Sequence, residues 1–249
     1  MSAELLLLAG GAAFAGLVQG ISGFAFAMVA MSVWVWGIEP RLAAAMAVCG
    51  GLLGQCIQVF TVKRGLAPGA LMPFVLGGLA GVPIGVWALP HLDPAVFKLT
   101  LGLFLVVCCP AMLWADRLPR LSFGGRWADG VVGLLGGVMG GIAGFSGVLP
   151  SLWVTLRGWD KDLQRGVIQN FSLAALAATL VAYIASGALT ADMASKFAIV
   201  APAMLLPSLL GARIYRGLSP LAFRRVVLLL LSAAGLAMVA AGLPALLRR

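Results

Sequence analysis

Apolar segments long enough to cross a lipid bilayer follow one another along almost the whole chain. Only 10% of the 249 residues are charged and 62% are hydrophobic, whereas a soluble domain carries about 25% charged residues. The chain has room for roughly eight to ten helical crossings of about 20 residues each. The longest polar stretch covers only residues 115–126. This pattern predicts an all-α polytopic membrane protein without a soluble domain.

Glycine and serine interrupt two of these apolar segments at corresponding places. GISGFAF occupies residues 20–26, and GIAGFSG occupies residues 141–147. In lipid, a broken helix leaves backbone groups without partners, so a break is tolerated only where protein or a water-filled cavity surrounds it. We therefore expect the two breaks to line a cavity, one entering from each side of the membrane.

The two breaks belong to an internal duplication. With an offset of 121 residues, five of the nine residues in 16–24 match those in 137–145. Gly37 and Glu39 then correspond to Gly158 and Asp160. Further along, the offset grows to 126, which indicates short loop insertions between matching elements. Internal duplication is typical of secondary transporters.

The distribution of the 17 Lys and Arg residues indicates how the halves are oriented. If residues 5–36 formed one long crossing, nine of these residues would lie on one face and eight on the other. If each broken segment turns back on itself, twelve share one face, and that bias marks the cytoplasmic side. The five on the opposite face are then Arg41, Lys98, Lys196, Arg248 and Arg249. The bias predicts two inverted-topology repeats and places both termini outside the cytoplasm.

Each repeat is predicted to contain a broken, re-entrant helical hairpin followed by three transmembrane helices. The first repeat covers residues 1–115, a cytoplasmic linker covers 116–127, and the second repeat covers 128–249. The predicted hairpin arms are 4–19 and 22–36, then 128–143 and 146–157. The predicted transmembrane helices are 42–62, 68–89, 95–114, 163–186, 194–214 and 221–244. Tryptophans near these ends are expected to be interfacial anchors: Trp34, Trp36, Trp87, Trp114 and Trp153.

Charged groups are missing from the middle of every predicted span. All eight acidic residues fall in loops or at predicted helix ends, whereas ion-coupled transporters commonly place a carboxylate within the membrane. The chain also lacks a nucleophile–base pair, a metal-ligand cluster and a phosphate-binding loop, so we expect no enzyme, no metal and no cofactor. The net charge of +9 is explained by cytoplasmic loops and does not indicate nucleic acid.

Neutral polar residues remain inside the predicted spans and are the candidate substrate-binding residues. Helix arms that start at the breaks would point free N–H groups and positive dipole ends into the cavity, which suits an anion. The purely structural alternatives are close helix packing for the serines and interhelical hydrogen bonds for the glutamines. The candidates are Gln19, Ser22, Gly23, Gln55, Gln58, Ser146, Gly147, Gln169, Asn170 and Ser172.

Three segments resemble the sulfite exporter TauE/SafE family of membrane permeases: GLVQGISGFAFAMV, GGVMGGIAGFSGVLPSL and LLGARIYRGLSPLAFRRVVLLLL. The resemblance covers nearly the whole chain. Pro150 is similar to a proline of the family after the second break, whereas Val29 takes the matching place in the first half. The resemblance implies transport of a sulfur-containing anion such as sulfite, thiosulfate or an organosulfonate.

These features together predict a secondary transporter of the bacterial inner membrane that works by alternating access. An inside-negative potential drives a monovalent anion outward by about 2.3 kcal/mol per 100 mV, which favours export. The alternatives are an anion channel, import of the organosulfonate, and a non-transporting membrane scaffold or an enzyme that acts on lipid-soluble substrates. The expected partners are the small anionic substrate and the lipid bilayer; a homodimer is compatible with the sequence, which marks no dimer face.

Overall fold

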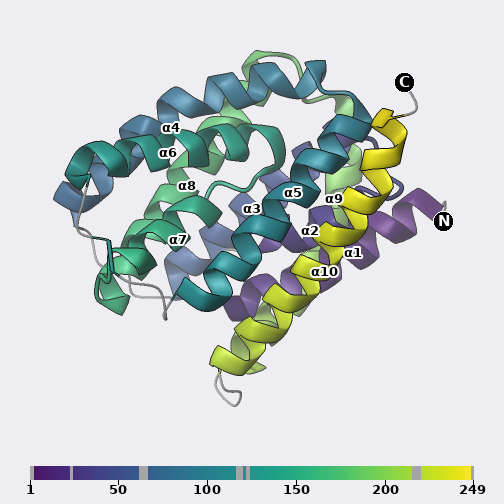
Figure 1. Cartoon of the computed structure of the whole chain (residues 1–249). Helices are drawn as coiled ribbons and strands as arrows, with labels where there is room; N and C mark the ends of the chain where they lie inside the picture. The colour runs from purple at the N-terminus through teal and green to yellow at the C-terminus, as the bar shows by residue number, and fades with distance from the viewer. Residues whose placement is uncertain are drawn as a thin grey trace.

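The computed structural model describes residues 3–22, 25–61, 67–115, 120–121, 124–214 and 220–247, and all regular structure in these residues is helical. The helices pack into one bundle (Figure 1). Their bounds are α1 Ala3–Ser22, α2 Phe26–Trp34, α3 Pro40–Thr61, α4 Pro68–Ala88, the short 3₁₀ helix η1 Leu89–His91, α5 Pro94–Trp114, α6 Gly125–Ala143, α7 Val148–Leu156, α8 Lys161–Ala185, α9 Ala191–Ile214 and α10 Pro220–Leu247.

Proline and aspartate define several of the helix starts. Proline is the first residue of four helices, α3, α4, α5 and α10, where its missing N–H costs nothing and its fixed φ suits the helix. Asp93 accepts a hydrogen bond from the N–H of Ala95 at 2.8 Å. Asp160 caps α8 in the same way. These signals explain why the helices begin within a few residues of the predicted positions.

Seven helices in the described part of the chain are long and apolar enough to cross a membrane: α1, α3, α4, α5, α8, α9 and α10. The six predicted transmembrane helices are all among them, so the prediction of an all-α membrane protein is confirmed. The second arms of the broken segments are shorter than predicted. α2 and α7 have nine residues each, which is about 13 Å of helix, less than half of the roughly 30 Å hydrocarbon core.

Both broken segments turn back on themselves. The indole N–H of Trp34, at the end of α2, donates to the carbonyl of Leu7 in α1 at 3.2 Å. The indole N–H of Trp153, in α7, donates to Asp129 near the start of α6 at 2.7 Å. Each second arm therefore runs antiparallel to its first arm, as the charge distribution predicted. Trp34 is fully buried, so the prediction that it is an interfacial anchor is wrong.

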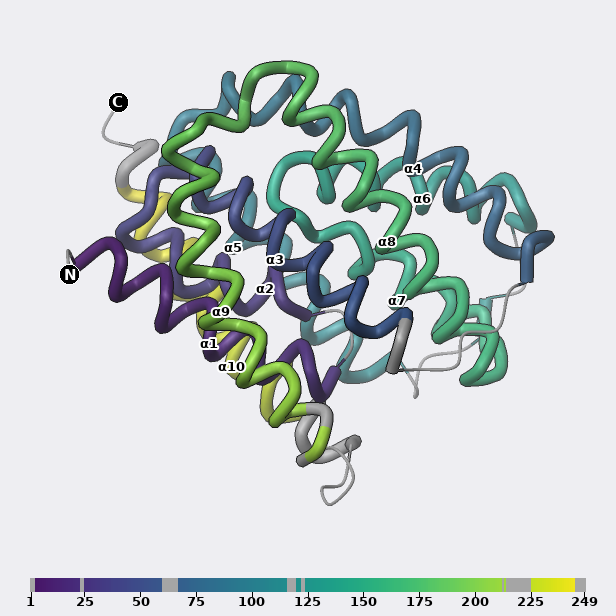
Figure 2. Tube along the Cα trace, turned by 180° about the vertical axis from the view of Figure 1, so that it is seen from behind, coloured from purple at the N-terminus to yellow at the C-terminus, as the bar shows by residue number. Residues whose placement is uncertain are grey.

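The long arm of each hairpin packs against a helix of the other half. α6 lies along α4, and α1 lies along α9 (Figures 1 and 2). Both pairs run in parallel, and glycines bring their backbones so close that a Cβ would collide, as in small-residue helix pairs of membranes. The corresponding contacts are Gly137 with Gly78 and Gly141 with Gly85, then Gly16 with Met204 and Gly20 with Gly211. The two halves are therefore interlocked and do not form separate bodies.

Helices that correspond between the halves pack antiparallel to each other. Gly102 of α5 lies against Met238 of α10, and Leu99 lies against Gly242. Between α3 and α8, Gly51 lies against Leu176. The start of α1 and the end of α10 lie toward the same end of the molecule (Figures 1 and 2). We call this the outer end, and the opposite end, which contains Gly125 and Arg157, the inner end; their orientation in a membrane stays a prediction.

Half of the predicted linker between the halves, residues 116–127, lies outside the described residues. α6 begins inside it, at Gly125. Leu121 donates its backbone N–H to the carbonyl of Leu156 at 2.8 Å. A Cβ on Gly158 would meet the side chain of Arg120, so the linker passes beside the end of α7.

Candidate functional site

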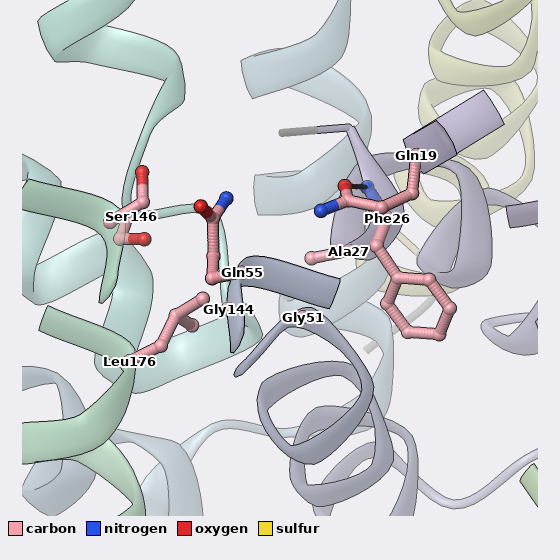
Figure 3. A pocket seen from close by; sticks show the side chains of 9 residues that line it. Gln19, Phe26, Ala27, Gly51, Gln55, Gly144, Ser146 and Leu176 are labelled. Atoms are coloured by element: carbon pink, nitrogen blue, oxygen red, sulfur yellow. Dashed lines mark hydrogen bonds between the residues drawn. The ribbon is translucent and has the colours of Figure 1, made fainter. Parts of the chain in front are cut away.

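The two breaks leave a small polar cavity near the centre of the bundle. Its walls come from α1, α2, α3, α8 and the loop between α6 and α7 (Figure 3). The space open to the centre of a water-sized sphere is about 10 Å³, which holds about one water molecule. The lining residues are Gln19, Phe26, Ala27, Gly51, Gln55, Gly144, Ser146, Ser172 and Leu176.

The second break closes around a glycine with a left-handed backbone. Gly144 has φ 76° and ends α6 by donating its N–H to the carbonyl of Gly140. Phe145 donates to the carbonyl of Met139 at 3.2 Å. This arrangement satisfies two carbonyls that the helix end would otherwise leave free, and it needs a residue without a Cβ. The turn carries Ser146, which is 1% exposed, into the wall of the cavity.

At the first break, Gln19 connects the two arms. Its Oε1 accepts a hydrogen bond from the backbone N–H of Phe26, the first residue of α2, at 3.0 Å. Because a backbone N–H can only donate, the oxygen of the carboxamide faces Phe26 and the nitrogen faces the other way. That nitrogen lies against α3, where a Cβ on Gly54 would be 2.8 Å from it. In the view of Figure 3, the side chain of Gln55 extends between Gln19 and Ser146.

Ser172 supplies a hydroxyl to the opposite wall. The residue is 2% exposed, and its Oγ has no hydrogen-bond partner among the described residues. A Cβ on Gly147 would lie 2.5 Å from this oxygen, so the glycine gives the hydroxyl its space. A buried hydroxyl without a partner is costly, and a bound polar group would remove that cost.

The cavity lies where corresponding positions of the two halves meet. Gly51 and Ser172 are 121 residues apart, and so are Gln55 and Leu176; all four line the cavity. The offset of the duplicated breaks therefore continues into α3 and α8. The two halves contribute different chemistry, because carboxamides come from the first half and hydroxyls from the second.

Other predicted site residues lie outside the lining of the cavity. Gln169 donates from Nε2 to Oε1 of Gln58 at 2.8 Å, in a buried bond between α8 and α3. Ser22 accepts from the N–H of Ala25 at 3.3 Å. Asn170 has a buried Nδ2 without a partner among the described residues, and Gly147 lies next to Ser172 but does not line the cavity. Gly23 lies outside the described residues.

Sequence reasoning missed five lining residues: Phe26, Ala27, Gly51, Gly144 and Leu176. For two of them the signal was available. Adding 121 to Gln55 gives Leu176, and subtracting 121 from Ser172 gives Gly51. Apolar residues and glycines carry no polar group that marks them as binding residues, so only their correspondence to Gln55 and Ser172 identifies Leu176 and Gly51.

Among the described acidic residues, one has a buried carboxylate, although the sequence placed it at a helix end. Asp129 is 3% exposed and accepts from Trp153 at 2.7 Å. Its Oδ1 also lies 3.5 Å from Arg157, whose guanidinium is over the ring of Trp159. This group closes the inner end of the second hairpin and does not line the cavity. Among the described residues, no three His, Cys, Asp or Glu side chains gather as a metal site would require.

Comparison with known proteins adds one finding to this geometry. The family model described as "Sulfite exporter TauE/SafE" matches residues 8–238, which include both breaks and all the helices that line the cavity. Neither the curated proteins nor the solved structures include a significant match.

Proposed function

The chain belongs to the sulfite exporter TauE/SafE family, and on that premise we propose that it is a secondary permease for a small sulfur-containing anion such as sulfite, thiosulfate or an organosulfonate. We place the substrate in the cavity between the two breaks. Gln19, Gln55, Ser146 and Ser172 would hold its oxygens.

The observation that carries the proposal is the position of the cavity between two helix starts. α2 begins at Phe26 beside the cavity, and α7 begins at Val148, two residues after Ser146. The N-terminus of a helix attracts an anion through its free N–H groups and its dipole. At these two starts the N–H groups of Phe26 and Val148 already donate, to Gln19 and to Phe145, so the attraction comes from the dipoles and the remaining N–H groups. Transporters with inverted repeats use such half-helix starts near the middle of the membrane to hold anionic groups. The unpartnered Oγ of Ser172 points to the same kind of ligand.

The small size of the cavity favours a carrier over a channel. A space of about 10 Å³ is too small for an oxyanion of four or five heavy atoms, so the site must widen before the substrate binds. One helical turn nearer the inner end, the hydrogen bond between Gln58 and Gln169 joins α3 to α8 and would close a path from the inner end to the cavity. We propose that this bond opens when the inner side becomes accessible.

The interlocked packing suggests which parts move. α1 is fixed to α9, and α6 is fixed to α4, by closely packed glycines. We therefore propose that the moving units are these two pairs with their attached short arms, rather than residues 1–115 against 128–249. The antiparallel packing of α5 with α10 is the relation expected of inverted repeats, and it supports alternating access around a site shared by both halves.

We further propose export from the bacterial cytoplasm, with both termini outside. The bias of twelve against five basic residues supports this orientation. An inside-negative potential then drives a monovalent anion outward. If the chain imports its substrate, accumulation in vesicles must follow an imposed ion gradient rather than the voltage.

Flux in proteoliposomes tests the proposed function. Purified protein should exchange radiolabelled sulfite for unlabelled sulfite across the vesicle membrane, and Ser172→Ala should reduce this exchange. Ser232→Ala is the matched control, because the hydroxyl of Ser232 donates to the carbonyl of Leu228 in its own helix, away from the cavity. Current steps in planar bilayers would indicate a channel. An absence of exchange with sulfite, thiosulfate and methanesulfonate would contradict the proposal.

A further inference from the structure

We infer that Tyr183 is a positioning residue for the substrate site: its hydroxyl fastens the second break to α8 and thereby keeps Ser146 in the wall of the cavity. The inference rests on the proposed function and assigns a role in the same site to a buried group that does not line the cavity. Tyr183 would act on the substrate only through the turn that it holds.

Tyr183 forms a buried hydrogen bond at the end of α6. Its hydroxyl donates to the backbone carbonyl of Gly141 at 2.7 Å. Gly141 lies in the last turn of α6, and the last carbonyls of a helix have no partner within it. The backbone N–H groups of the following turn donate to the carbonyls of Gly140 and Met139 instead. The phenol therefore supplies the donor that the carbonyl of Gly141 lacks in its own hairpin.

The turn that carries Ser146 folds back onto the same part of α6. A Cβ on Gly140, the residue before Gly141, would lie 3.1 Å from Cβ of Ser146. A Cβ on Gly136 would lie 2.9 Å from the carbonyl oxygen of Ser146. Ser146 is buried and lines the cavity (Figure 3). Because closely packed groups cannot move independently, a shift in the last turn of α6 would displace Ser146.

α8 also supplies the other hydroxyl of the cavity, from Ser172. Ser172 and Tyr183 are eleven residues apart, which is about three turns, so they lie on one face of the helix. α8 is itself fixed to its neighbours, since Phe171 packs against Phe74 of α4 in an apolar cluster that also includes α7. The bond from Tyr183 thus sets Ser146 and Ser172 relative to each other.

The first half lacks the group that makes this bond. With the offset of 121 residues, Tyr183 corresponds to Val62, which has no hydroxyl. The first break is instead held within its own hairpin, by the hydrogen bond from the N–H of Phe26 to Gln19. The role of Tyr183 is therefore a feature of the second half and is not part of the packing that the duplication repeats.

Thr179 offers a matched control for Tyr183. It is fully buried and lies one turn away on α8, but its hydroxyl donates to the carbonyl of Ala175 in its own helix at 2.8 Å. Thr179→Val thus removes a buried hydroxyl from α8 and leaves the contacts of the second break unchanged. An effect seen in Tyr183→Phe and absent from Thr179→Val comes from the bond to Gly141.

The reactivity of a thiol at position 146 tests the inference without a ligand. In the full-length protein with its four native cysteines replaced by alanine, Ser146→Cys places a thiol in the turn. Its rate of reaction with a small methanethiosulfonate reagent reports how often the turn opens. We expect Tyr183→Phe to raise this rate by about threefold or more, because local opening becomes easier, and Thr179→Val to leave it unchanged. An unchanged rate in Tyr183→Phe, or an equal rise in Thr179→Val, would overturn the inference.

Calorimetry with methanesulfonate tests the link to the substrate. Tyr183→Phe should weaken binding by about fivefold, the equivalent of one hydrogen bond. In a protein that already carries Ser146→Ala, the same substitution should weaken binding little further, because Tyr183 acts through that hydroxyl. Additive losses would show that Tyr183 affects the site by another route and would also overturn the inference.

The outcomes separate this inference from the function on which it rests. If methanesulfonate, sulfite and thiosulfate all fail to bind to the wild-type protein, the proposed function fails, and the thiol reaction still decides the role of Tyr183. Should Tyr183→Phe not fold, amide hydrogen exchange in the wild-type protein decides it. The amides of Gly144 and Phe145 should then exchange as slowly as those of residues 172–179, and exchange more than about tenfold faster would show that α8 does not hold the turn.

Discussion

Gln19, near the end of α1, accepts a hydrogen bond from the backbone N–H of Phe26, the first residue of α2, at 3.0 Å. One side chain thereby has two roles. Its oxygen caps the start of the short arm, and its nitrogen faces away from that helix, as a donor beside the cavity. In the second half, the backbone turn at Gly144 instead caps the end of the long arm α6.

A matched pair of substitutions at Gln19 separates these roles. Gln19→Glu keeps an acceptor for the N–H of Phe26 but replaces the donor with a carboxylate, so the protein should lose anion binding. It should also melt below the wild-type temperature, because Gln19 is 1% exposed and a buried negative charge without a cation is costly. Gln19→Leu removes both groups, and the lost cap should cost about 1 kcal/mol of stability. Thermal unfolding and calorimetry with methanesulfonate measure the two effects. Retained binding in Gln19→Glu would place the anion elsewhere.

The pseudo-symmetry of the cavity can be tested by exchanging its partners. Gln55 and Leu176 occupy equivalent positions and both line the cavity. Gln55→Leu alone should weaken binding of methanesulfonate by about tenfold, the equivalent of one hydrogen bond to a charged group. Adding Leu176→Gln should restore most of the affinity, because the carboxamide returns from the other side of the same space. If the double variant binds no better than Gln55→Leu, the two positions do not serve one ligand.

Most of the fold could be predicted from the sequence because lipid leaves few choices. Spans must be apolar and helical, and the prolines that begin α4 and α5 stand within one residue of the predicted starts. The reversal of the broken segments could be predicted because this arrangement places twelve of the 17 Lys and Arg residues on one face and five on the other. The length of the short arms could not be predicted, since an apolar stretch such as 26–36 does not show where the helix ends and the loop begins.

The pairing of helices between the halves could not be predicted from the sequence. The glycines of α4 and α6 are visible in the sequence, yet no local rule says that Gly78 packs on Gly137 rather than on another small residue. The same limit affected the site. Gln58 and Gln169 were candidates by residue type, and only the structure shows that they bond to each other.

Gly147 should be intolerant of any side chain. A Cβ there would lie 2.5 Å from Oγ of Ser172, so Gly147→Ala should cost about 1–3 kcal/mol of stability and displace the hydroxyl from the cavity. Combining it with Ser172→Gly should recover the melting temperature but not anion binding. Gly10→Ala is the matched control, because nothing lies within 4 Å of a Cβ at that position. Equal effects of the two alanine substitutions would contradict the predicted clash.

The bond between Gln58 and Gln169 predicts a non-additive mutant cycle. Gln169→Leu removes the donor that Oε1 of Gln58 accepts from, and we expect a loss of about 0.6–2 kcal/mol, as for interhelical bonds in membranes. The double variant with leucine at both positions should be no less stable than the single variant, because no polar group is left behind. Flux should nevertheless change in the double variant if this bond closes the inner route. Wild-type flux in the double variant would show that the bond between Gln58 and Gln169 does not control access to the cavity.

Asp129 should matter for stability and not for the substrate. Asp129→Ala leaves the indole of Trp153 and the guanidinium of Arg157 without their partner, and we expect a loss of about 1–3 kcal/mol. The side chain of Arg157 is 19% exposed, so water limits the cost below that of a fully buried pair. Asp129→Asn keeps an acceptor for the indole and should lie between alanine and wild type. Both variants should bind methanesulfonate with wild-type affinity, because this cluster closes the inner end of the hairpin while the anion binds beside its tip. A loss of affinity in a well-folded Asp129→Asn variant would instead show that the charge of this pair acts on the cavity. The electrostatic potential of the site would then depend on Asp129 as well as on the neutral lining residues.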